Sequence, residues 1–252
     1  MPADKLRKYV HNALVEYIQQ NNDETELKKD LEEYGPLMAP VIVLDAVCTV
    51  VEGTKADFRA AMPGLLASLA KQGIVRASMI SDALSTYVDN PDTYADMEMD
   101  FPNIASFLGS LLGALAASNT FPLTSLTAKF SPEFKAAGYA GDLLVQAVAS
   151  MAKAAGAAKA ASVVSDSGVG LCCTWLAPAR ARAAIATLKR ADALRAFPDL
   201  QQIAALCDRA VPDGDVDAVL SFVSDLPNDL RRNADFCVQV RAARVSACVW
   251  VC

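Results

Sequence analysis

Apolar residues recur at a helical spacing along most of the chain. The first stripe has intervals of three and four residues, and its members are Leu6, Val10, Ala13, Leu14, Tyr17 and Ile18. A second helix is expected between the capping residues Asn22 or Asp23 and the stop signal Gly35-Pro36. Similar stripes predict a helix after the N-cap residue Thr54 and another over about residues 75–88. A break is expected at Asn90-Pro91, and a further stripe predicts a helix over 104–115.

Two segments depart from this amphipathic pattern. Residues 37–51 are apolar on every side, and although their Val and Ile content suits a strand, their length favours a helix at the centre of the fold. Residues 136–161 are rich in alanine, which has the highest helix propensity and allows close helix packing. No alternating strand pattern appears anywhere in the sequence.

Short turns between the predicted helices imply that consecutive helices are antiparallel. Helix pairs that stack in sequence order bury the apolar stripe of one pair on the next, which is the construction of an α-solenoid. The sequence contains no exact repeat, so the expected similarity to HEAT repeats is one of shape. We therefore predict an all-α, HEAT-like α-solenoid of stacked antiparallel helix pairs.

The predicted helices fall into two blocks. The segment SVVSDSGVG, at residues 162–170, has the composition of a linker. Apolar stripes return at Leu200, Ile203 and Leu206 and again over 216–223, and the chain ends on the apolar, uncapped sequence RVSACVWVC. We expect a helical domain over residues 1–165, followed by a linker and a partial helical segment over 166–252.

The composition narrows the function classes. The formal net charge of -6 argues against nucleic acid as the main partner, because phosphate binding requires a basic surface. Seven scattered cysteines without a CxxC pair, together with a single histidine, argue against a zinc site and indicate reduced thiols. The charged start of the chain lacks an apolar signal core, and the most apolar stretch, 104–118, is too short to span a bilayer. We expect a soluble, cytoplasmic protein that needs no membrane.

The sequence offers no positive case for an enzyme. His11 lies beside the first apolar stripe and far from any serine turn motif, so it is interpreted as a surface or boundary histidine. The GSLLG segment at 109–113 is typical of close helix packing, and SDSGVG lacks the strand and the Lys-Ser/Thr pair of a phosphate loop. No catalytic residue, metal ligand or cofactor is therefore predicted.

The segment YADMEMDFPNI, at 94–104, holds the unusual charge of this chain. Residues 77–128 contain six carboxylates and no Lys or Arg. One interpretation is capping: Asp100 would be the N-cap of the following helix, with Pro102 in its first turn, at about 1 kcal/mol. Capping leaves Asp96 and the missing lysines unexplained. The second interpretation adds a docking surface that receives cations from another protein.

These residues resemble a known family. The segments LVEYIQQNNDETELKKDLEEY, DMEMDFPNIASFLGSLLGALAAS and KFSPEFKAAGYAGDLLVQAVASMAKAAG resemble the MA-3 domain, and the match covers about residues 5–165. The most specific part is the family's Asp-x-x-x-Asp-x-Pro element. Its acidic positions fall on Asp96 and Asp100, and its proline falls on Pro102, whereas Phe101 and Asn103 differ from the residues frequent in relatives.

The resemblance implies a non-enzymatic partner of the DEAD-box RNA helicase initiation factor 4A. In the family the two acids face basic residues of that helicase. The segment over about 200–250 is weakly similar to the C-terminal HEAT domain of the initiation factor 4G scaffold, which favours a translation initiation scaffold that also meets other initiation factors. The alternatives are an inhibitor of the same helicase, similar to programmed cell death 4, and a structural helical-repeat adaptor.

Overall fold

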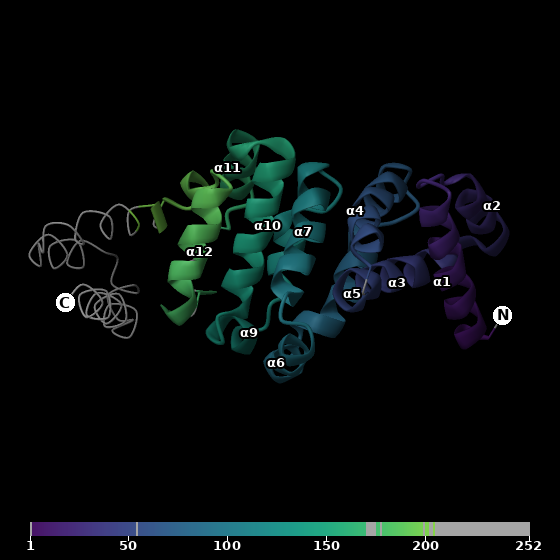
Figure 1. Cartoon of the computed structure of the whole chain (residues 1–252), viewed down its shortest axis with the longest axis horizontal. Helices are drawn as coiled ribbons and strands as arrows, with labels where there is room; N and C mark the ends of the chain where they lie inside the picture. Colours follow the sequence, from purple (N-terminus) through teal and green to yellow (C-terminus); the bar gives the residue numbers. More distant parts are fainter. Residues whose placement is uncertain are drawn as a thin grey trace, which may run out of the picture.

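The chain folds as a stack of helices. The computed structural model describes residues 2–53, 55–169, 175–176, 178–198, 200–201 and 204, and every regular element in this part of the chain is a helix. The helices pack side by side along one long axis (Figure 1), which confirms the predicted all-α, solenoid-like fold. The elements are α1 (Ala3–Gln19), α2 (Thr25–Tyr34), the 3₁₀ turn η1 (Gly35–Leu37), α3 (Met38–Glu52), α4 (Ala56–Lys71), α5 (Ala77–Val88), α6 (Pro91–Asp100), α7 (Ile104–Ala117), α8 (Leu123–Thr127), α9 (Pro132–Ala136), α10 (Tyr139–Ala155), α11 (Ala157–Asp166), α12 (Pro178–Arg190) and the 3₁₀ turn η3 (Leu194–Ala196).

Helix α3 is the centre of the N-terminal half. It contacts α1, α4, α5 and α7. These neighbours bury most of its surface, which confirms the central helix predicted over 37–51, while Val41, Leu44 and Cys48 form a partly exposed stripe. The buried residues are Met38, Ala39, Ile42, Val43, Asp45, Ala46, Val47, Val50 and Val51.

Helices α7 and α10 form the closest pair in the C-terminal half. Gly109 of α7 faces Gln146 of α10, and Gly113 faces Ser150, so contacts advance in the same direction and the two helices run parallel. A Cβ atom at Gly113 would lie only 2.7 Å from Cβ of Ser150 and 2.8 Å from the backbone nitrogen of Met151. The GSLLG segment therefore serves close helix packing, as its spacing indicates.

The segment before α7 folds differently from the prediction. Asn90 and Pro91 do not break the chain but start α6: the Asn90 side chain accepts a hydrogen bond from the Asp92 backbone N–H, and Pro91 occupies the first turn. Asp100 is the last residue of α6, and α7 begins after Asn103. The prediction that Asp100 caps α7, with Pro102 inside its first turn, is therefore wrong.

Three further predictions concern other positions. Residues 162–166 were expected in a linker but continue α11, because the alanine-rich helix breaks earlier, at Gly156 with φ +88°, and then resumes. The prediction of Thr54 as N-cap is wrong, because α4 begins at Ala56 and its N-cap residue is Lys55, whose side chain makes no capping hydrogen bond. Most of the block predicted after residue 200 lies outside the described residues. The domain boundary at 165 stays a prediction.

A second group of buried residues joins α10 to α12. Leu144 and Val148 of α10 pack in one cluster with Ala184 and Leu188 of α12 and with Leu200. Helix α12 is therefore attached to the stack through an apolar core of its own. Among the described residues no single helix is long and apolar enough to cross a bilayer; only α6 and α7 together reach that length and composition, and they bend by 106° at the turn between them.

Candidate acidic docking surface

Helix α6 projects from one edge of the stack and is anchored mainly by Tyr94. The Tyr94 side chain is fully buried, and its ring packs against the rings of Phe134 and Tyr139 at centroid distances of 5.1 and 4.7 Å. Burial and the neighbouring carboxylates Glu98 and Asp142 raise the pKa of Tyr94. Met97 is half-buried against the same core. The exposed residues of this short helix are Asp92, Thr93, Asp96, Met99 and Asp100.

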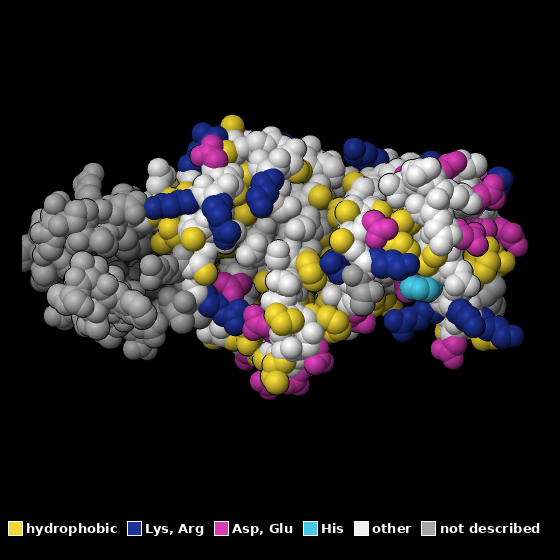
Figure 2. Space-filling model, viewed as in Figure 1, with side chains coloured by type: hydrophobic (Ala, Val, Ile, Leu, Met, Phe, Trp, Pro, Cys, Tyr) yellow, Lys and Arg dark blue, Asp and Glu magenta, His cyan; other side chains and the backbone are white. Residues whose placement is uncertain are grey.

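The outward side of α6 carries the predicted acids. Asp96 and Asp100 lie one helical turn apart, both are exposed, and neither has a hydrogen bond or ion pair with another described residue. Pro102 follows in the exposed turn that leads to α7. The structure thus places the three predicted site residues along one short exposed segment, which we call the α6 edge (residues 96–102). Figure 2 shows acidic side chains gathered at this edge of the molecule.

The charge at the α6 edge is unfavourable for the helix itself. Asp100 lies at the C-terminal end of α6, where the exposed carbonyl groups already carry partial negative charge. Asp96 and Asp100 are also like charges four residues apart. Because neither acid caps a helix, the stabilising role that capping would have given Asp100 is absent.

An apolar side chain accompanies these charges. Met99 is 80% exposed, the largest exposed fraction among the large hydrophobic side chains described. It lies between Glu98 and Asp100 in α6. The exposure of Met99 follows from helical spacing, because Tyr94 and Met97 share the inner side of α6 and Met99 falls outside it. No helix is predicted over this segment from the sequence alone, so this exposure is not predicted either. An exposed methionine beside two carboxylates suits a protein partner that presents cations around a small apolar depression.

The third acid of the helix is neutralised within the chain. Glu98 accepts two hydrogen bonds from the Arg180 guanidinium of α12, at 3.0 and 2.9 Å, and Arg180 also donates to Asp142 of α10 at 2.5 Å. Burial raises the pKa of Asp142, while its hydrogen bond with Arg180 opposes that shift. Asp82 is likewise paired, with Lys129 at 3.2 Å. The chain therefore neutralises Glu98 and leaves Asp96 and Asp100 available.

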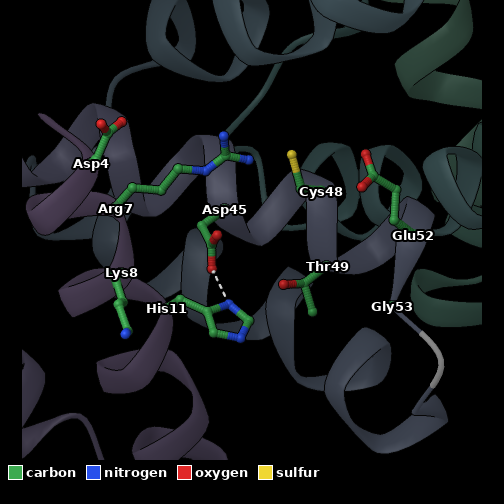
Figure 3. Close-up of a pocket in the computed structure, with 9 residues that line it drawn as sticks. All are labelled: Asp4, Arg7, Lys8, His11, Asp45, Cys48, Thr49, Glu52 and Gly53. Carbon is green, nitrogen blue, oxygen red and sulfur yellow. Dashed lines mark hydrogen bonds and ion pairs between the residues drawn. The ribbon is translucent and has the colours of Figure 1, made fainter.

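A separate groove lies between α1 and α3 (Figure 3). Its volume is about 570 Å³, and acids, cations and a thiol line it. His11 Nδ1 lies 3.0 Å from Asp45 Oδ2, and the exposed His11 ring confirms its interpretation as a boundary residue. Burial raises the pKa of the Cys48 thiol, whose sulfur points away from His11. The groove therefore does not form a nucleophile–base pair from these side chains.

Compared with models of known protein families and with curated proteins, the sequence of this chain matches none.

Proposed function

We propose that this chain is a non-enzymatic adaptor of translation initiation that binds the DEAD-box RNA helicase initiation factor 4A through the α6 edge, in the cytoplasm. The observation that carries the proposal is the state of Asp96 and Asp100. Both are exposed, and neither is paired with a cation among the described residues, although the chain pairs Glu98 two residues away. The resemblance of residues 94–104 to the acidic element of the MA-3 domain supports the choice of helicase.

The chemistry of the edge suits an arginine-bearing partner. An arginine can bind a carboxylate through two parallel hydrogen bonds, which gives both strength and orientation. Two carboxylates one turn apart present such sites about 6 Å from each other along the helix. Met99 supplies an exposed apolar side chain between them, and burial of that side chain would exclude water from the charged contacts. The expected interface is therefore a small charged one with an apolar centre.

A titration of the purified helicase with the full chain tests the proposal. Charge reversal in Asp96→Lys/Asp100→Lys should weaken binding by at least about tenfold, since close charge pairs at interfaces commonly contribute more than 1.4 kcal/mol. Binding of the unaltered chain should also weaken as salt is raised from 50 to 300 mM, because exposed charges are screened, and the variant should lose that dependence.

The matched control is Glu16→Lys/Glu32→Lys, which makes the same net-charge change at exposed positions in α1 and α2. It should leave the affinity nearly unchanged. Equal affinity of the unaltered chain and the α6 variant, with both folded by circular dichroism, would exclude the α6 edge as the helicase site. A helicase ATPase assay on the same mixtures separates the two roles: a scaffold leaves turnover unchanged or raises it, and an inhibitor lowers it.

A further inference from the structure

Helix α6 makes few buried contacts with the rest of the fold, although the proposed binding surface lies on it. It is ten residues long, and Tyr94 is its one fully buried residue. The Tyr94 hydroxyl is also buried and has no hydrogen-bond partner among the described residues, so the anchor holds through ring packing alone. Met97 adds a half-buried apolar contact, and a directional polar attachment would further fix the rotation of α6 about its own axis, and with it the direction of Asp96 and Asp100.

Arg180 supplies that attachment. Its guanidinium holds both carboxylate oxygens of Glu98 in a two-pronged contact, reaches Asp142 of α10, and lies over the ring of Tyr139 at 4.9 Å from the centroid. The Arg180 and Glu98 side chains are 32% and 28% exposed, so the contact is partly shielded from water. A two-pronged contact between planar groups restricts rotation, which a single charge contact does not.

The arginine itself is held on a firm support. Leu188 and Ala184 of α12 are buried against α10. Before α12, the Trp175 ring packs edge-on against the Phe130 ring, and the Lys135 ammonium lies over the Trp175 ring, 5.1 Å from its centroid. Gly141 allows this approach, because a Cβ atom there would come within 2.6 Å of the Trp175 carbonyl carbon. Residues beyond 165 therefore add to the support of α6, which also rests on Phe134 and Tyr139.

We propose that Arg180 is a positioning residue of the α6 edge, so that α12 belongs to the binding unit although the resemblance to the MA-3 domain stops at about residue 165. The partner side of this inference rests on the proposed function. The structural side, that Arg180 fixes α6 through Glu98, can be tested in the free chain.

Positioning and simple electrostatics predict opposite results for Arg180→Met. The substitution removes a cation and releases the Glu98 carboxylate beside Asp96 and Asp100. If charge alone governed binding, a basic partner would then bind more tightly. If orientation governs binding, affinity falls because α6 no longer holds one direction. We expect a fall of roughly tenfold, within the range of couplings between contacting residues.

Two further variants make the comparison sharp. Arg190→Met makes the same charge change on the same helix, but among the described residues Arg190 bonds within its own helix, to the Ala186 carbonyl and the Thr187 hydroxyl. It should leave helicase binding and the exchange of α6 amides unchanged. Arg180→Met/Asp142→Asn keeps the net charge of the unaltered chain and avoids leaving the Asp142 carboxylate without its partner. It should still weaken binding.

The experiment combines hydrogen exchange of the free chain with the helicase titration. In both Arg180 variants the amides of residues 94–101 should exchange about tenfold faster, while those of α3 keep their protection. If the α6 amides keep their protection in a folded Arg180→Met/Asp142→Asn chain, or if either Arg180 variant binds as tightly as the unaltered chain or more tightly, the positioning role is overturned. If the unaltered chain does not bind the helicase, the proposed function fails, and the exchange measurement still decides whether Arg180 holds α6.

Discussion

Replacing Asp100 by lysine should stabilise the free chain, which is the opposite of what the sequence alone predicts. An N-cap aspartate would lose about 1 kcal/mol on substitution. Asp100 instead ends α6, and the Phe101 backbone N–H closes the last turn onto the Met97 carbonyl at 2.7 Å. The Asp100 carboxylate therefore lies beside the negative end of the helix and four residues from Asp96.

The expected gain follows from two terms. A cation in place of an anion at a helix C-terminus is worth about 0.3–1 kcal/mol at an exposed position. Removing the repulsion between Asp96 and Asp100 adds about 0.2–0.5 kcal/mol, and forming an attractive pair with the acid on the N-terminal side adds about the same again. The sum is a gain of about 0.7–2 kcal/mol at low salt, and it should shrink at 0.5 M salt because both groups are exposed.

Urea unfolding followed by far-ultraviolet circular dichroism measures this gain, with Asp92→Lys as the matched control. Asp92 lies in the first turn of α6 and is also four residues from Asp96. The control variant also removes a repulsion with Asp96, but it loses the favourable interaction of an acid with the helix N-terminus. The free energies of unfolding of the two variants should therefore differ by about 1 kcal/mol. A loss of stability in Asp100→Lys, or equal effects at the two ends of the helix, would refute the assignment of Asp100 to the C-terminus of α6.

Two other predictions concern packing and pH. Gly113→Ala should destabilise the chain by about 1–3 kcal/mol despite its gain in helix propensity, because the added methyl group meets the α10 backbone. Gly64→Ala in α4 should stabilise the chain by up to about 1 kcal/mol, because no atom lies within 4 Å of the added methyl group. Thermal unfolding measures both changes in stability. Burial raises the pKa of Tyr87 above its ordinary value of 10.0, so above pH 10 the unfolded chain releases this proton and the folded chain keeps it. Stability should therefore fall with rising pH, by at most about 1.4 kcal/mol per pH unit for this tyrosine, and Tyr87→Phe should make the decline in urea titrations between pH 9 and 11 less steep.

Features that depend on continuous local patterns could be predicted from the sequence. The segment over 37–51 is apolar on most sides because neighbours bury most of α3, and its length favours a helix over a strand. The GSLLG spacing indicated close packing, because two glycines four residues apart leave one side of a helix without Cβ atoms, and the partner helix α10 fills that space. In both cases the pattern on one element carried the information.

The start of α6 was present in the sequence but was interpreted as a break. Asn90-Pro91-Asp92 combines a preferred N-cap residue, a proline in the first turn and an acid near the helix N-terminus, all of which favour a helix start. The dipeptide Asn90-Pro91 also suits a break after the helix predicted over 75–88. Reading it as a break places the next N-cap at Asp100, ten residues after Asn90, and so gives Asp100 the wrong role.

The contact between Glu98 and Arg180 could not be predicted from the sequence. The two residues are 82 positions apart, and nothing in the local sequence of either helix indicates a contact with the other helix. Their pairing depends on how α12 packs against α10, which is decided by side-chain shape in the core rather than by any local motif.

The distribution of pairing along α6 supports the proposal of a docking surface over a merely solvated face. A solvated acidic face is normally interleaved with lysines at helical spacing, as α2 is, where Lys28 and Lys29 pair with Glu24 and Glu26. Helix α6 has no lysine. Of its four acids, Asp92 lies near the helix N-terminus, where a negative charge is favourable, and Glu98, which faces the stack, is held by Arg180. Asp96 and Asp100 face outward and are left unpaired among the described residues at a cost to the helix. Unpaired charge that lowers stability is expected where function requires it, because stability and binding then impose opposite demands on the same residues. Asp100→Lys should therefore improve folding and weaken helicase binding in one variant, a combination that a purely solvated face does not produce.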